Sequence, residues 1–273
     1  MLADLILVGV TLLVLLIASI FDLKTREIPD TLSYGLIVVA LSIRLINGVT
    51  AHAFSYFLYG LIGLGVAFIF GYVLYHLKQM GGGDAKLLMG FGAAFGSFGS
   101  TFIVALALAI LFIGGLYCFL WAFVIFVQHR GKAWPLFLSA IKKYRRLHSI
   151  LLGLCILVLV FGFLTPTVTQ ILLAALVVAL IASFYLSFFI RVVEKVSFLR
   201  FVPLKELTEG DWLAKDVKIK NKIILSARIP SLEEKHIHLL KEKGIKRVWI
   251  KIGIPFVPAY FIAVLSTVLI FFF

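Results

Sequence analysis

Two aspartates, Asp22 and Asp84, are the residues of this chain whose type and position suggest chemistry. Each lies at the end of an apolar run, and acidic side chains at membrane depth are costly unless they face a cavity or a partner. If the two runs pack side by side, the carboxyl groups come within hydrogen-bonding distance of each other. Carboxyl groups that close share a proton, so one can activate a bound water while the other donates a proton to a carbonyl. The pair therefore predicts amide hydrolysis that uses no metal, cofactor or nucleophilic side chain.

Three consecutive glycines, Gly81 to Gly83, precede Asp84. Because they have no side chains, the backbone there can approach another segment closely, which favours a contact between the two apolar runs. Asp84 also fits the N-cap of a helix that follows a loop. A phosphate-binding loop is a weaker alternative, because no Gly-Lys-Ser/Thr sequence follows and an anionic aspartate would repel phosphate.

Asp22 begins a short polar segment that continues to Ile28, Pro29 and Asp30. Taken alone, Asp22 is equally well explained as an interfacial residue that contacts water and pairs with Arg26, four residues later. The functional interpretation of Asp22 therefore depends on its pairing with Asp84.

The composition indicates that a membrane surrounds these segments. Hydrophobic residues make up 62% of the 273 residues and charged residues 14%, and the mean hydropathy is +1.12. Ordinary globular domains are about half apolar and about a quarter charged. We predict an all-α polytopic membrane protein with about six to eight transmembrane helices and a small α/β cytoplasmic insert. The apolar spans are expected at 3–21, 29–46, 54–77, 85–98, 101–127, 149–164, 168–190 and 255–273.

The fourth span, 85–98, is unusually short. At 1.5 Å per residue it reaches about 21 Å, less than the roughly 30 Å of the hydrocarbon core. Either its ends are submerged or the glycine-rich segment before it enters the membrane, where non-helical backbone is tolerated only against protein or water.

The positive charge of the chain is distributed asymmetrically. The net charge is +13, and 25 of the 26 Lys and Arg residues fall on one side of the predicted spans; the exception is Arg44. Because cations accumulate on the cytoplasmic side of membrane proteins, we predict both termini outside and both aspartates near the cytoplasmic face. This topology explains the charge better than nucleic-acid binding, which we do not expect.

Three parts are predicted along the chain. Residues 1–190 form a transmembrane helical domain that contains both aspartates, 191–252 form a soluble cytoplasmic α/β domain, and 253–273 form the last transmembrane helix. Within the α/β domain, 217–226 alternates in polarity like a strand and 247–252 is expected to be a second strand.

A helix is predicted between these strands, from Ser231 to Lys243. Ser231 is expected to cap it, Glu234 to complete a capping box and Gly244 to end it.

Two prolines, Pro255 and Pro258, mark the beginning of the last span. We favour the interpretation that they occupy its first helical turn, where proline is tolerated. The alternative is that they hold an unwound backbone near the two aspartates.

The two aspartate motifs resemble a known family. Gly81-Gly82-Gly83-Asp84-Ala85-Lys86 is similar to the GxGD motif of type IV prepilin peptidases and archaeal preflagellin peptidases. Asp22 followed by Ile28-Pro29-Asp30 resembles that family's first catalytic block, although Asn is often expected at position 30. The resemblance covers about residues 10–127. It implies that Asp22 and Asp84 are catalytic, and that the residues which shape the site or bind substrate are Gly81, Gly83, Lys86, Ile28, Pro29, Glu27 and Asp30.

The resemblance also implies a reaction and a location. Members of this family are membrane aspartyl endopeptidases that remove basic leader peptides from preflagellins and prepilins at the cytoplasmic face of the cell membrane. Partners would be such substrates and the lipid bilayer, and Glu27 and Asp30 would form an acidic rim for the leader. Cys118 and Cys155 form no Cys-x-x-Cys zinc motif and no S-adenosylmethionine site is visible, so we expect peptidase activity without methylation. The soluble segment 191–252 suggests the archaeal branch.

Three alternatives remain open from the sequence. The first is a presenilin-like protease that cleaves inside the membrane. The second is a transporter in which Asp22 and Asp84 relay protons or cations. The third is an assembly protein that docks through 191–252 and does not need either aspartate.

Overall fold

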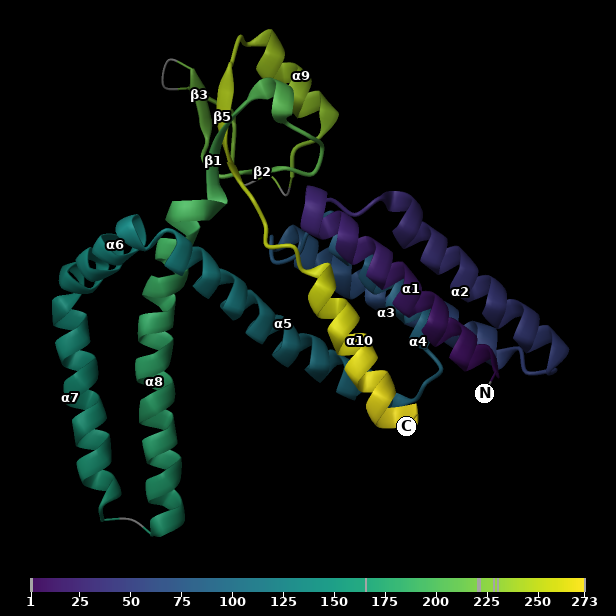
Figure 1. Ribbon diagram of the computed structural model, residues 1–273, viewed down its shortest axis with the longest axis horizontal. Helices are drawn as coiled ribbons and strands as arrows, with labels where there is room; N and C mark the ends of the chain where they lie inside the picture. The colour runs from purple at the N-terminus through teal and green to yellow at the C-terminus, as the bar shows by residue number, and fades with distance from the viewer. Residues whose placement is uncertain (1, 165, 220–221, 228, 230, 273) are drawn as a thin grey trace. The chain divides into compact units, whose positions relative to one another are not determined.

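The computed structural model describes residues 2–164, 166–219, 222–227, 229 and 231–272. The chain forms two compact units, drawn with their elements in Figure 1. The first unit consists of Met1–Leu120 together with Phe201–Phe273, and the second unit of Trp121–Arg200. The domain boundaries predicted at 190 and 252 were based on the polarity of the segments, whereas the two units are defined by their compactness. The predicted domains therefore stay a prediction.

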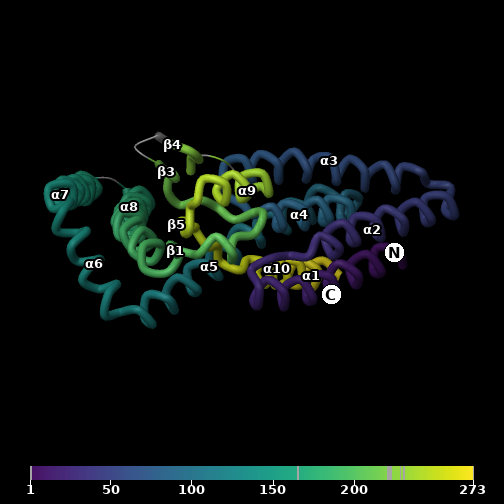
Figure 2. The backbone as a smooth tube through the Cα atoms, turned by 90° about the horizontal axis from the view of Figure 1, so that it is seen from above, coloured from purple at the N-terminus to yellow at the C-terminus, as the bar shows by residue number. Residues whose placement is uncertain are grey.

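The first unit contains a helical bundle built from the two ends of the chain. In this bundle α4 packs against α2 and α3, whereas α10 packs against α1; Figure 2 shows α4 between α3 and α2. The C-terminal helix thus completes a bundle that the N-terminal helices begin. The helices are α1 (Leu2–Thr25), α2 (Asp30–Thr50), α3 (Ser55–His76), α4 (Gly82–Phe95), the beginning of α5 (Ser100–Gln128) and α10 (Val257–Phe272).

Glycines bring α3 and α4 into backbone contact. A Cβ atom added to Gly63 would overlap the carbonyl group of Gly92, and one added to Gly92 would overlap the carbonyl of Gly63. At Gly96 an added Cβ would overlap the carbonyl oxygen of Tyr59. Small residues allow membrane helices to approach closely and gain packing energy, so these glycines fix the C-terminal half of α4 against α3.

The C-terminal end of α4 is closed by a buried arginine from α2. The Arg44 side chain is 0% exposed, and its guanidinium donates hydrogen bonds to the carbonyl oxygens of Ala93 (2.7 Å) and Ala94 (2.6 Å). It also donates to the Tyr56 carbonyl oxygen (3.0 Å) and to Ser97 Oγ (2.9 Å). The last carbonyl groups of a helix have no partner within the helix, and they carry partial negative charge. Arg44 therefore supplies both the hydrogen bonds and the charge that this helix end requires.

A second layer of contacts surrounds Arg44. Its guanidinium lies over the Tyr56 ring, 4.6 Å from the centroid, and the Tyr56 hydroxyl donates to Asp4 Oδ1 at 2.7 Å. Gly60 makes room for the arginine, because a Cβ there would overlap Arg44 Cδ. Arg44 is thus not a surface cation on the far side of the membrane but an internal partner of α4.

The second unit contains one helix that the sequence did not predict. The segment 129–148, expected to be a basic connector, contains α6 (Arg130–Lys143). It precedes the antiparallel pair α7 (Arg145–Gly162) and α8 (Thr167–Val193), which is followed by a π-helical turn at Glu194–Phe198. The frequent charges of α6 lower its hydropathy, so its sequence contains no apolar run that would predict a membrane helix.

The segment that precedes α10 folds as a small α/β region. Its three-stranded sheet has the order β1-β5-β2, and β2 pairs with β5 in antiparallel orientation. Leu232, Leu240 and Val248 are buried in its core. The strands and helix are β1 (Leu199–Pro203), β2 (Trp212–Leu213), β3 (Val217–Ile219), β4 (Lys222–Leu225), α9 (Glu234–Glu242) and β5 (Arg247–Lys251).

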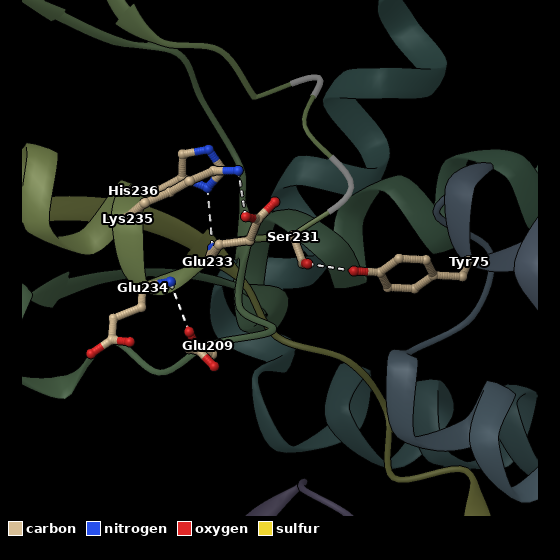
Figure 3. Close-up of polar contacts among 7 residues, drawn as sticks. All are labelled: Tyr75, Glu209, Ser231, Glu233, Glu234, Lys235 and His236. Atoms are coloured by element: carbon tan, nitrogen blue, oxygen red, sulfur yellow. Dashed lines mark hydrogen bonds and ion pairs between the residues drawn. The ribbon is translucent and has the colours of Figure 1, made fainter.

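Two predictions for this region were wrong in detail. The single strand expected over 217–226 is instead two antiparallel strands, β3 and β4; residues 220 and 221 lie outside the described residues. The N-cap of α9 is Glu233, which forms a capping box with His236 rather than the predicted box of Ser231 with Glu234. Figure 3 shows the Ser231 hydroxyl directed instead at Tyr75. The predicted strand near 247–252 is confirmed as β5, and Gly244 follows α9 with a left-handed φ of 68°.

The described residues include six helices that are long and apolar enough to cross a membrane: α1, α2, α3, α5, α7 and α8 with its π-helical extension. The apolar helix α10 is shorter, and α4 has 14 residues. The predicted all-α polytopic architecture with a small α/β insert is therefore confirmed.

Replacement of Arg44 by methionine is expected to destabilise the first unit. Methionine fills a similar volume but leaves the buried carbonyl oxygens of Ala93 and Ala94 without their donor, at a cost on the order of 3 kcal/mol. The measurement is the apparent melting temperature of the purified protein in detergent. Lys241→Met, at an exposed position of α9, is the control for loss of a cation.

A pair of glycine variants on α3 tests the same contact from the other side. Gly60→Ala should also lower the melting temperature, because its Cβ overlaps Arg44 Cδ, whereas Gly65→Ala should not, because nothing lies within 4 Å of its added Cβ. Equal melting temperatures for Arg44→Met and the wild type would contradict the role of Arg44.

Candidate active site

Asp22 lies in the last turns of α1, at the end of the first unit where α10 begins. Its side chain is buried, with 5% exposure, and its Oδ2 accepts a hydrogen bond of 2.9 Å from the backbone N–H of Val257. Val257 is the first residue of α10, where backbone N–H groups have no partner within the helix. The beginning of the C-terminal helix therefore orients this carboxylate directly.

Asp84 lies in the first turn of α4. Its Oδ1 atom is buried and has no hydrogen-bond partner among the described residues. A Cβ atom added to Gly81 would lie 3.1 Å from Asp84 Oδ2, so the glycine leaves room for the carboxylate. Asp22 is close enough for its charge to act on Asp84. The tertiary structure thus brings together two buried carboxyl groups, one held by an N–H group and one with an oxygen atom available.

The two sequence motifs contact each other through Gly83 and Ile28. A Cβ atom at Gly83 would lie 3.0 Å from Ile28 Cβ and 3.1 Å from Ile28 Cδ1. Pro29 follows as the N-cap of α2, so it fixes the turn that carries Ile28. A glycine at position 83 allows the beginning of α4 to approach this turn.

Lys86 and Asp30 form an ion pair beside this contact. Lys86 Nζ donates to Asp30 Oδ1 at 2.6 Å, and it also lies over the Tyr34 ring, 5.3 Å from the centroid. The pair connects the first turn of α4 to the first turn of α2. Asp30 is therefore paired with a lysine of the same chain, although the sequence suggested it as an acidic residue of the rim that would bind the leader.

Glu27 contacts the α/β region. Its Oε1 accepts a hydrogen bond of 3.0 Å from Thr208 Oγ1, and the backbone N–H of Thr208 donates to Asp211 Oδ2 at 2.9 Å. Burial raises the pKa of Asp211, the hydrogen bonds from Thr208 oppose this shift, and the negative charge of Glu27 adds to it. Asp211 was not identified from the sequence, because it lies far from Glu27 along the chain and no sequence pattern indicates that the two residues are neighbours.

Further contacts hold the α/β region at this end of the first unit. The Tyr75 and Ser231 hydroxyl oxygens lie 2.5 Å apart (Figure 3), and Lys78 Nζ donates to the Ala227 carbonyl oxygen. Burial lowers the pKa of the Lys78 ammonium group. The α/β region therefore contacts the ends of α1 and α3 that adjoin Asp22 and Asp84.

Tyr260 is a site residue that the sequence pattern did not predict. It is 0% exposed, the charges of both aspartates act on it, and its hydroxyl lies 3.9 Å from Met80 Sδ. The sequence signal for Tyr260 is its spacing from Val257. Residues three apart on a helix lie on the same face, so Tyr260 faces the same side of α10 as Val257.

Each of the two interpretations of the prolines near the beginning of α10 is correct for one of them. Pro258 lies in the first helical turn, as favoured from the sequence, while Pro255 precedes the helix in a non-helical stretch, 252–256. This stretch leads directly to the Val257 N–H that binds Asp22, so the unwound backbone does lie beside the candidate site.

Comparisons with known proteins agree with these motifs. Residues 9–119 match the model of the type IV leader peptidase family. The preflagellin peptidase of Methanocaldococcus jannaschii is 39% identical over 79 residues, which are 29% of this chain and 33% of that protein. The preflagellin peptidases of Methanococcus voltae and Methanococcus maripaludis are 38% identical over 90 residues (33% and 38% of the two chains) and 35% identical over 79 residues (29% and 34%). No solved structure matches.

The family resemblance inferred from the two aspartate motifs is therefore confirmed over 9–119, the segment that contains both of them. The matched segments span about a third of the curated relatives' own length, between 33% and 38%. The matched part of the chain includes α2, α3 and α4 and contains Asp22 and Asp84, but not α10.

Replacement of Gly83 by alanine is expected to destabilise the contact between the two motifs. The added methyl group must displace Ile28, a crowding that costs about 1–3 kcal/mol in packed interiors, so the melting temperature in detergent should fall. Gly82→Ala is the matched control, because its Cβ would lie 3.7 Å from Tyr75 Cε2, an ordinary contact. If both variants lose the same amount of stability, the close approach at Gly83 is not the cause.

Proposed function

We propose that this chain is a membrane aspartyl endopeptidase that removes the leader peptide of preflagellin-like or prepilin-like proteins at the cytoplasmic face of the cell membrane. The observation that carries the proposal is the pair of buried carboxyl groups, Asp22 and Asp84, at one end of the first unit. The match to the type IV leader peptidase family and the names of the methanogen relatives support a peptidase.

The two aspartates take different roles in the proposed reaction. The Val257 N–H donates to Asp22 Oδ2, an arrangement suited to the ionised carboxylate, so Asp22 is the general base. Asp84 Oδ1 has no hydrogen-bond partner among the described residues, although the backbone N–H of Gly81 acts on the same carboxyl group. The unpartnered oxygen suits the carboxyl group that holds the shared proton. Asp22 takes a proton from a water molecule as its oxygen attacks the scissile carbonyl, and Asp84 protonates the carbonyl oxygen. When the tetrahedral gem-diol collapses, the C–N bond breaks, the departing amine takes the proton from Asp22, and one hydroxyl proton of the intermediate returns to Asp84.

The location of the pair suits a substrate that is itself anchored in the membrane. Lys24 lies in the last turn of α1, and Arg26 and Lys78 lie in the connectors after α1 and α3, at the same end of the helices as Asp22 and Asp84. These cations support a cytoplasmic location for this end. A substrate whose apolar segment stays in the bilayer would then present the peptide bond just before that segment to the pair. The residues proposed to shape this site are Gly81, Gly83, Ile28, Pro29 and Lys86.

A transporter is less well supported than a peptidase. Coupling-ion sites of transporters usually lie near the bilayer midplane between structural repeats. Asp22 and Asp84 lie instead at the ends of α1 and α4, beside a non-helical stretch and the α/β region. Intramembrane cleavage of the presenilin kind would likewise call for a scissile bond at greater depth.

The aspartate pair can be tested by cleavage of a tagged preflagellin in membranes that contain each variant. Asp22→Asn and Asp84→Asn keep the shape of the side chains but remove the shared proton, so each should reduce the rate by about a thousandfold or more. Glu242→Gln, at an exposed position of α9, is the matched control and should cleave at the wild-type rate.

The expected result requires normal amounts of both asparagine variants in the membrane. Cleavage at the wild-type rate by either variant would make the carboxyl groups structural. If the wild type also fails to cleave prepilin and preflagellin, the proposal is wrong, and proton transport becomes the function to measure.

The acidic rim of the site makes a separate prediction. With Asp30 paired to Lys86, Glu27 and Asp211 are the carboxylates proposed to attract a basic leader. Glu27→Gln is expected to raise KM a few-fold for a substrate with a lysine-rich leader, because exposed charge pairs contribute up to about 1 kcal/mol. For a leader whose lysines are replaced by glutamine, KM should not change. An equal increase for both leaders would exclude charge recognition by Glu27.

A further inference from the structure

The charged residues of the second unit are almost all cationic. Within 121–200 the sequence has nine Lys and Arg residues and a single acidic residue, Glu194. Such an imbalance destabilises a compact unit by self-repulsion unless counter-charges come from outside. The cations are Arg130, Lys132, Lys142, Lys143, Arg145, Arg146, Arg191, Lys195 and Arg200.

The tertiary structure gathers many of these cations at one end of a helical pair. The helices α7 and α8 are antiparallel neighbours, so the beginning of α7 and the end of α8 lie together (Figure 1). The helix α6 packs against both. The charges at the end of α6, the beginning of α7 and the end of α8 therefore lie at the same end of this helical pair, although they are distant in sequence.

A hollow of about 180 Å³ opens between α6 and α8. Three cations line it, Lys143 from α6, Arg191 from α8 and Lys195 from the π-helical turn, together with the hydroxyl-bearing Ser139. Glu194 is not among the lining residues. The Ser139 hydroxyl donates its proton to the Leu136 carbonyl oxygen at 2.8 Å, so the three cations carry the complementarity of the hollow to a phosphate group.

The rest of the lining, and the surface of α6, are apolar. Trp134 and Leu138 on α6 are 54% and 41% exposed. The remaining lining residues of the hollow are Leu136, Ala140, Tyr144, Phe188 and Val192. A helix with cations beside exposed Trp and Leu side chains is typical of the membrane interface, where the apolar groups meet the acyl chains and the cations meet the headgroups. Inorganic phosphate would use only the cations, whereas a phospholipid would use both kinds of surface.

We propose that the hollow between α6 and α8 binds the headgroup of an anionic phospholipid, with α6 lying in the membrane interface. Basic pockets between membrane helices recognise anionic headgroups by this combination of charge and depth. The bound lipid would neutralise Lys143, Arg191 and Lys195, and so relieve the repulsion among them. This site lies outside the segment that matches the peptidase family, and the proposal does not depend on the peptidase activity.

The test compares lipid binding to the purified full-length chain by native mass spectrometry, with phosphatidylglycerol and phosphatidylcholine as probes. The wild type should bind phosphatidylglycerol more tightly than phosphatidylcholine. The variant Lys143→Gln/Arg191→Gln/Lys195→Gln should bind phosphatidylglycerol about tenfold or more weakly, because each cation near an anionic headgroup contributes to binding. Its phosphatidylcholine binding should change little.

The matched control removes three exposed cations from the α/β region. Lys241→Gln/Lys243→Gln/Lys246→Gln produces the same change in net charge and should keep the wild-type affinity. If the triple variant of the hollow does not fold, Arg191→Gln alone should still weaken phosphatidylglycerol binding a few-fold.

Three outcomes would overturn the proposal. Equal phosphatidylglycerol affinities for the hollow variant and the control would mean that only net charge matters. Equal affinities of the wild type for the two lipids would exclude recognition of an anionic headgroup. Displacement of phosphatidylglycerol by inorganic phosphate at millimolar concentration would assign the hollow to free phosphate instead.

Discussion

A bilayer provides no water for the ends of a helix, so the ends of α4 must be satisfied by protein. This helix has 14 residues and is too short to bring both ends to the aqueous interfaces. Arg44 binds the carbonyl groups at its C-terminal end, and the opposite end carries Asp84 in its first turn. The cation at the C-terminal end is favourable with the helix dipole. The position of the candidate site therefore depends on how α4 is held.

The site is assembled from α1, α4 and α10, and close packing and a backbone hydrogen bond hold its parts in place. Glycine contacts fix α4 against α3, and the turn before α2 meets the beginning of α4 through Gly83 and Ile28. The helix α10 returns from the far end of the chain and donates the Val257 N–H to Asp22. Because α10 lies outside the segment that matches the peptidase family, the matched motifs alone do not complete the site.

The two units of the chain have different physical characters. The first unit combines buried carboxyl groups, a buried arginine and an α/β region of mixed charge. The second unit has nine cations and one acidic residue, with exposed aromatic and aliphatic side chains beside them. The first arrangement suits chemistry in a protected site, and the second suits a surface that meets lipid headgroups.

The sequence by itself determined the membrane architecture, the short fourth span and the two aspartates with their flanking glycine and Ile-Pro motifs, because these depend on local composition and spacing. It did not reveal α6, whose charges hide its helical pattern, or the capping of α9 by Glu233, since Ser231 contacts Tyr75 instead. Only the tertiary structure buried Arg44, paired Asp30 with Lys86 and brought the Val257 N–H to Asp22. Each of these contacts joins residues that are far apart along the chain, and packing rather than local preference selects such partners.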